Sequence, residues 1–124
     1  MHWVLLFAGG GLGAVLRFAL ALWVDERLPV AFPWGTFSVN VVGCFAIGVI
    51  ATLADEGELL RPATRLFLIT GLLGGFTTFS TFGMETWQLV QDRAAALAIL
   101  NAVGSLAAGL AAVVAGVVAT RSLL

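Results

Sequence analysis

Two adjacent glycines and two adjacent threonines stand close together in the middle of a long apolar stretch, at residues 74–75 and 77–78. Glycine pairs weaken a helix, and threonine hydroxyls can hydrogen-bond to backbone groups that a break sets free, so this segment predicts an interrupted helix. Within a membrane, a break persists only where the freed carbonyl groups face protein, water or an ion. Carbonyl oxygens suit a small cation, whereas the end of a half-helix can face an anion. The alternative is a continuous helix with a packing patch of small residues.

A line of polar residues continues from this segment along one side of the following helix. Its members, spaced three or four residues apart, are Thr77, Thr81, Glu85, Gln88 and Asp92. Beside this line, three phenylalanines recur at every third residue: Phe76, Phe79 and Phe82. A carboxylate that faces lipid is costly, so the polar line is expected to face protein or water. Aromatic ring edges and hydroxyl hydrogens are both partly positive, and together they could line a path for an anion.

Further polar residues lie in the other apolar stretches. Asn40 stands among valines, so its amide needs a partner, a water or an ion. Arg17 lies about 10 Å from the end of its predicted helix. Its side chain can therefore snorkel to the interface or recruit anions into a wet vestibule. Asn101 and Ser105, in the last stretch, could face the same path.

The composition places the whole chain in a bilayer. Charged residues make up 10% of the 124 residues, against about a quarter in a soluble domain. Apolar stretches of membrane-spanning length occur at residues 3–24, 34–54, 64–91 and 95–119. The sequence therefore predicts one all-α integral membrane domain over residues 1–124, with four transmembrane helices of which the third is broken in mid-membrane.

Several other classes of protein do not fit this composition. The net charge is −1 and the six basic residues, all arginines, are scattered, which argues against a nucleic-acid partner. His2 and Cys44 are the only residues of their kinds, so they form neither a metal cluster nor a disulfide. They also lie in different segments and cannot pair as nucleophile and base, so we expect no enzymatic activity.

The arginines leave the orientation of the four helices almost undetermined. Arg61, Arg65 and Arg121 fall on one side of the predicted membrane, and Arg27 and Arg93 fall on the other. The positive-inside rule needs a clearer bias than three against two. We therefore expect insertion in both orientations, which permits an antiparallel dimer. Four packed helices leave no lumen, so a path for solute would run along the dimer interface.

Pairs of small residues four positions apart predict close packing between helices. Such pairs occur in three of the four stretches: Gly9/Gly13, Gly10/Ala14, Gly71/Gly75, Gly104/Ala108, Ser105/Gly109 and Ala112/Gly116. Their density favours tight packing between subunits.

Three segments of the chain together resemble one known family. The run Gly71–Phe82, with its core from Gly74 to Phe82, is similar to the third-helix signature of the Fluc (CrcB) fluoride channels. The segments Pro33–Gly43 and Gly10–Arg17 resemble the start of the second helix and the first-helix motif of that family. The resemblance extends over the whole chain.

The resemblance implies a fluoride-selective channel that exports fluoride passively from the cytoplasm of a prokaryote, across its plasma or inner membrane. It implies a dual-topology antiparallel homodimer with two pores, and a structural sodium ion that is not transported. The residues expected to bind this sodium ion through backbone carbonyl groups are Gly74 and Thr77. Those expected along the fluoride path are Asn40, Phe79, Phe82, Ser80, Thr81, Glu85 and Ser105, with Arg17 in a vestibule.

Two other functions are compatible with the size of the chain. A small multidrug or cation exchanger also has four spans, but it needs a carboxylate in its first span, where this chain has Arg17. A scaffold subunit would explain the small-residue pairs but not Asn40 or the line of hydroxyl groups and phenylalanines. Replacing Phe82 or Asn40 would be silent in a scaffold.

Overall fold

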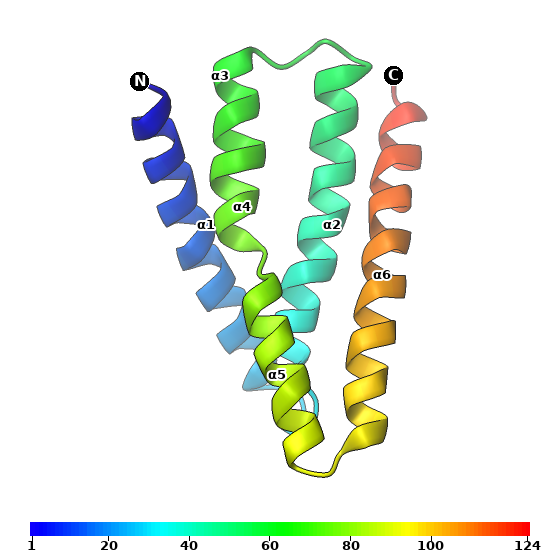
Figure 1. The fold of residues 1–124 in the computed structure, drawn as a ribbon. Helices are drawn as coiled ribbons and strands as arrows, with labels where there is room; N and C mark the ends of the chain where they lie inside the picture. Colours follow the sequence, from blue (N-terminus) through cyan, green and yellow to red (C-terminus); the bar gives the residue numbers. More distant parts are fainter.

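The computed structural model describes residues 1–124, and every regular element in it is a helix (Figure 1). Three of the helices are uninterrupted: α1 (His2–Asp25), α2 (Trp34–Asp55) and α6 (Ala95–Arg121). Each consists largely of apolar residues and contains no proline beyond its first turn, so nothing within it prevents regular hydrogen bonding.

The segment between α2 and α6 is built from four consecutive pieces. They are α3 (Pro62–Arg65), the π-helical stretch η1 (Leu66–Leu73), α4 (Gly74–Phe76) and α5 (Phe79–Gln91). Taken together as Pro62–Gln91, this segment joins α1, α2 and α6 as the fourth helix that is long and apolar enough to cross a membrane. The predicted all-helical fold with four membrane-spanning segments is therefore confirmed.

The helices pack as a splayed bundle in which both chain ends lie beside the α2–α3 loop (Figure 1). The α1–α2 and α5–α6 loops lie at the opposite end (Figure 1). The main packing contacts join α2 to α6, and α1 to η1 and α4. A small core forms between α2 and the third segment, around Val39, Leu73 and Phe76.

Glycines set how closely the helices of this one chain approach each other. A Cβ atom on Gly9 would lie 2.8 Å from the carbonyl oxygen of Phe67, and one on Gly75 would overlap the backbone of Gly10. Gly48 of α2 and Gly116 of α6 meet in the same way. The prediction that the small-residue pairs pack subunits together is therefore wrong for Gly9, Gly75 and Gly116, because these glycines bring helices of a single chain into contact.

An ion pair joins the end of α2 to the end of α6. The Arg121 guanidinium donates to both carboxylate oxygens of Glu56, with Nε–Oε distances of 3.0 and 2.9 Å. The hydrogen bond from Arg121 is the main cause that holds the pKa of the Glu56 carboxyl below its ordinary value; desolvation, the next in size, raises this pKa, and the charge of Arg121 lowers it further.

This lowered pKa predicts a small acid-dependent loss of stability. Because the pKa of Glu56 is depressed in the folded protein, its contribution is present above the unfolded-state pKa, about 4.3. It is lost as the pH falls through the folded-state value. We expect wild type to melt slightly above Arg121→Gln in detergent at neutral pH, and the difference to shrink on acidification. A constant difference down to about pH 3 would contradict this assignment.

Candidate functional site

The third membrane segment loses its helical backbone at Thr77 and Thr78. Both residues have extended conformations, with ψ angles of 155° and 123°, between α4 and α5. The Thr78 side chain caps α5 by accepting a hydrogen bond from the backbone N–H of Thr81, at 3.3 Å. The Thr77 hydroxyl donates to the carbonyl of Leu73 at 2.9 Å, within the preceding turn. Threonine side chains therefore hydrogen-bond to the backbone on both sides of the interruption.

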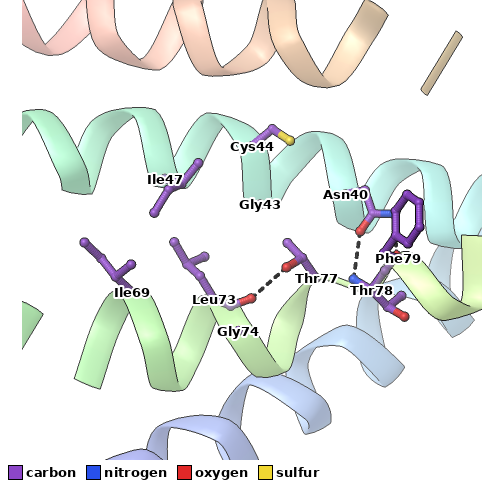
Figure 2. A pocket seen from close by; sticks show the side chains of 10 residues that line it. All are labelled: Asn40, Gly43, Cys44, Ile47, Ile69, Leu73, Gly74, Thr77, Thr78 and Phe79. Atoms are coloured by element: carbon purple, nitrogen blue, oxygen red, sulfur yellow. Dashed lines mark hydrogen bonds between the residues drawn. The ribbon is translucent and has the colours of Figure 1, made fainter. Parts of the chain in front are cut away.

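Asn40 of α2 supplies the partners that the interrupted backbone needs. Its Nδ2 donates to the carbonyl oxygen of Thr78, and its Oδ1 accepts from the backbone N–H of Thr78, each at 3.0 Å (Figure 2). One side-chain amide thus satisfies both polar backbone groups of one residue. An unpaired backbone group in an apolar medium is costly, so this pair of hydrogen bonds stabilises the interruption.

The interruption leaves carbonyl groups at the end of α4 without helical partners, among them those of Gly74 and Thr77. In a continuous helix the N–H of Thr78 would donate to Gly74, but here it donates to Asn40. Likewise the N–H of Thr81 donates to the Thr78 hydroxyl and not to the carbonyl of Thr77. Gly74 and Thr77 are the two residues predicted to bind a sodium ion. Hard oxygen donors of this kind fit a small cation.

The first cavity lies beside this interruption, between α2 and the third segment (Figure 2). Its volume is about 380 Å³, and Asn40, Gly74, Thr77 and Phe79 all line it. Gly43 allows α2 to approach so closely, because a Cβ atom there would overlap the Thr77 methyl group. The structure thus brings two of the predicted path residues next to both predicted sodium ligands.

The second cavity, of about 410 Å³, gathers polar groups from three helices. Arg17 of α1, Thr36 of α2, and Thr81 and Glu85 of α5 line it, together with Thr78 at the interruption. The Thr36 hydroxyl donates to Oε1 of Glu85 at 2.8 Å. Oε2 of Glu85 is buried and has no hydrogen-bond partner within the chain.

The third cavity, of about 530 Å³, lies at the end of the bundle that holds the α1–α2 and α5–α6 loops. Asp25, Glu85, Gln88 and Asp92 are its polar lining residues. The polar line predicted along this segment is therefore divided among three cavities. Thr77 faces the first, Thr81 the second, and Gln88 and Asp92 the third, whereas Glu85 lines both the second and the third.

The predicted row of three phenylalanines is divided by the interruption. Phe76 is only 8% exposed and belongs to the core with Val39, so its expected place in the row is wrong. The rings of Phe79 and Phe82 remain neighbours, with centroids 5.6 Å apart. Phe79 is 83% exposed in the single chain. The change in backbone direction after Phe76 explains the difference, because the spacing of a regular helix no longer applies across it.

The remaining predicted residues line none of the three cavities. The Ser80 hydroxyl lies 3.4 Å from that of Thr78. Ser105 donates to the Asn101 side chain at 3.2 Å, and Asn101 in turn donates to the Thr86 hydroxyl at 2.9 Å. Asn101 is 1% exposed, so these bonds form a buried polar link between α5 and α6.

Thr36 is a site residue that was not predicted from the sequence. It lies four residues before Asn40, and residues at this spacing share one face of a helix. A second polar residue on the face of Asn40 was therefore a readable signal. Its partner, Glu85, is distant in the sequence, so their contact could not be read from spacing.

Comparisons with known proteins agree on one family. Residues 4–117 match the family model described as "CrcB-like protein, Camphor Resistance (CrcB)". A protein of Chloroflexus aurantiacus named "Fluoride-specific ion channel FluC" is 47% identical over 109 residues, covering 88% of this chain and 86% of the relative. Proteins with the same name from Acidobacterium capsulatum and Sorangium cellulosum are 47% and 40% identical, over 94% and 99% of this chain and 91% and 97% of the relatives.

Proposed function

Because this chain belongs to the CrcB family of fluoride channels, we propose that it lets fluoride leave the cytoplasm passively, and so reduces fluoride toxicity. It is a multi-pass membrane protein, and in a bacterium its membrane is the plasma membrane. Hydrogen fluoride enters cells as a neutral acid and ionises in the neutral cytoplasm. The resulting anion is trapped unless a selective path lets it leave down its gradient.

The observation that carries this proposal is the second cavity. Its lining combines the hydroxyl groups of Thr36, Thr78 and Thr81 with the guanidinium of Arg17. The Thr36 hydroxyl donates to Glu85 and the Thr78 hydroxyl donates to Thr81, which leaves the hydroxyl hydrogen of Thr81 to face an anion in this cavity. A hydroxyl hydrogen can replace a water molecule around a small anion, and it binds the anion less tightly than a fixed cation would. Arg17 forms no ion pair within the chain, so its charge can attract an anion into this cavity and offset the two carboxylates, Asp25 and Glu85, that also line it.

We assign the fluoride path to residues around and beyond the interruption. The residues proposed to contact the moving ion or shape its path are Asn40, Phe79, Phe82, Ser80, Thr81, Glu85 and Ser105. Arg17 is proposed for the vestibule. The clustering of Arg17, Thr81 and Glu85 around one cavity supports this assignment, as does the position of Asn40 beside Phe79 at the first cavity. Ser105 has the weakest support, because its hydroxyl is engaged by Asn101.

We further propose that two chains form an antiparallel homodimer with a pore along each side of the interface. A single chain leaves Phe79 83% exposed beside the first cavity. A second chain in the opposite orientation would cover that side and repeat every contact by symmetry. The nearly equal numbers of arginines on the two sides of the membrane favour such dual insertion.

A sodium ion at the centre of this dimer would be held by the carbonyl groups of Gly74 and Thr77. Both groups lack their usual helical partners because the N–H groups of Thr78 and Thr81 are used elsewhere. The ion would supply the positive charge that those oxygens need, and we propose that it is structural and not transported. The chain contains no group of three or more acidic, histidine or cysteine side chains that could hold a metal ion.

Fluoride efflux from liposomes tests the proposed function directly. The purified chain alone is reconstituted into liposomes loaded with potassium fluoride, and a fluoride electrode records release after addition of valinomycin. We expect rapid fluoride release, with no matching chloride release from liposomes loaded with potassium chloride. Release equal to that of empty liposomes would overturn the proposal. Release that needs a proton gradient and not valinomycin would instead indicate an exchanger.

A further inference from the structure

The second and third cavities meet at two carboxylates. Among all the residues that line these cavities, only Asp25 and Glu85 line both. The third cavity lies towards the loops, and the second lies towards the interruption of the third segment. An ion that passes between the two cavities must therefore pass Asp25 and Glu85.

Asp25 is fixed by a contact with the first turn of α2. Its Oδ1 accepts a hydrogen bond from the backbone N–H of Gly35 at 2.8 Å. Gly35 is the second residue of α2, so its N–H has no partner within the helix and a carboxylate there is favourable. A Cβ atom on Gly35 would lie 2.5 Å from Oδ2 of Asp25 and 2.7 Å from Oδ1, so a larger residue there would displace the Asp25 carboxylate from this contact.

The residue that follows Gly35 holds the second carboxylate. Thr36 is 9% exposed, and its hydroxyl donates to Oε1 of Glu85 at 2.8 Å. The chain of contacts therefore runs from Asp25 at the end of α1, through the first turn of α2, to Glu85 on α5. Any movement of the first turn of α2 would displace the Thr36 hydroxyl from Glu85.

We propose that Asp25 is a positioning residue for the fluoride path, which sets the passage between the two cavities by anchoring the first turn of α2 and thereby the Thr36–Glu85 hydrogen bond. This inference rests on the proposed fluoride conduction. It concerns a residue outside the three segments that resemble the family, and it assigns Asp25 no direct contact with the ion.

The negative charge of Asp25 is not what this role requires. Glu85 carries the same sign of charge nearby, and a second carboxylate beside an anion path can only repel the anion. Arg17 on the side of the second cavity and Asp92 on the side of the third are the other charged lining residues. An uncharged acceptor at residue 25 would anchor Gly35 without adding to this repulsion.

Two substitutions of Asp25 separate anchoring from charge. Asp25→Ala removes the acceptor, and we expect fluoride efflux from liposomes to fall by about tenfold. Asp25→Asn keeps an oxygen acceptor in the same place, and we expect efflux to stay within about twofold of wild type or to exceed it. Glu26→Ala, at the neighbouring exposed carboxylate, is the matched control and should conduct as wild type does.

A double substitution tests the same contact from its other side. Gly35→Ala places a methyl group against the Asp25 carboxylate, so we expect it to slow efflux while Asp25 is present. The double variant Asp25→Ala/Gly35→Ala removes that overlap, and its efflux should be no slower than that of Asp25→Ala alone. Size-exclusion profiles and melting temperatures in detergent identify any variant that is misfolded, and efflux is compared among the folded ones.

Each outcome decides one of the two proposals. If wild type releases no fluoride, the proposed function fails and the role of Asp25 fails with it. If wild type conducts and Asp25→Ala conducts equally well, only the positioning role is overturned. Equal losses in Asp25→Ala and Asp25→Asn would overturn it as well, because they would assign the effect to charge.

Discussion

Asn40→Ala is expected to lower fluoride efflux at least about a hundredfold. The substitution removes both hydrogen bonds to the backbone of Thr78, whose N–H and carbonyl groups are then left in an apolar setting. The backbone at residues 77–78 must then find new partners. This rearrangement is expected to move the carbonyl groups of Gly74 and Thr77 and to close the first cavity. The measurement is the initial rate of valinomycin-dependent fluoride release.

Asn40→Asp provides a sharper version of this test. It keeps the acceptor for the Thr78 N–H, but it replaces the donor with an oxygen that repels the Thr78 carbonyl and any passing anion. We expect Asn40→Asp to conduct as poorly as Asn40→Ala. The matched control is Thr120→Val, which also removes one hydrogen bond of a buried polar side chain, but within α6 and away from the three cavities. Fluoride efflux in Asn40→Ala within twofold of the Thr120→Val rate would refute the assigned role.

Phe82→Ile is expected to lower fluoride efflux about tenfold or more while the protein stays folded. The substitution keeps an apolar side chain but removes the partly positive ring edge. Phe82 is the ring neighbour of Phe79, at 5.6 Å between centroids, and α5 buries none of its residues in the single chain. Its loss should therefore change conduction much more than stability, which is measured as the melting temperature in detergent.

Phe7→Ile is the control for this substitution. Phe7 is 86% exposed on α1 and lines none of the described cavities, so the same chemical change there should leave efflux unaltered. If Phe82→Ile conducts as Phe7→Ile does, the ring at residue 82 has no part in the path. Equal losses in both variants would point to a general effect of phenylalanine on folding or insertion.

The fold was readable from the sequence because it depends on hydrophobicity and length. Charged residues mark the ends of α1, α2 and α6, and apolar runs between them are long enough to span a bilayer. The contacts that build the site were less accessible, because they join residues far apart in the chain. Asn40 and Thr78 are 38 residues apart, and Thr36 and Glu85 are 49 apart.

Helical spacing also gave a wrong prediction for the row of phenylalanines, because the backbone is not helical between Phe76 and Phe79. Phe76 precedes the extended residues Thr77 and Thr78, and Phe79 follows them, so the two rings do not share a face. Phe76 joins the core, whereas Phe79 is exposed. The small-residue pairs likewise predicted close helix packing correctly but predicted the wrong neighbour. Small residues four positions apart indicate that another helix packs closely, but they do not indicate which helix it is.

The double hydrogen bond between Asn40 and Thr78 has a consequence for biogenesis. Residues 62–91 are apolar enough to enter the bilayer as one segment, and in isolation a regular helix would best satisfy their backbone groups. We therefore expect the interruption to form after insertion, when α2 docks and the Asn40 amide hydrogen-bonds to Thr78. Since α2 is synthesised first, that amide is already in the membrane when the third segment arrives. On this expectation, maturation includes a local unwinding of the third segment as it associates with α2.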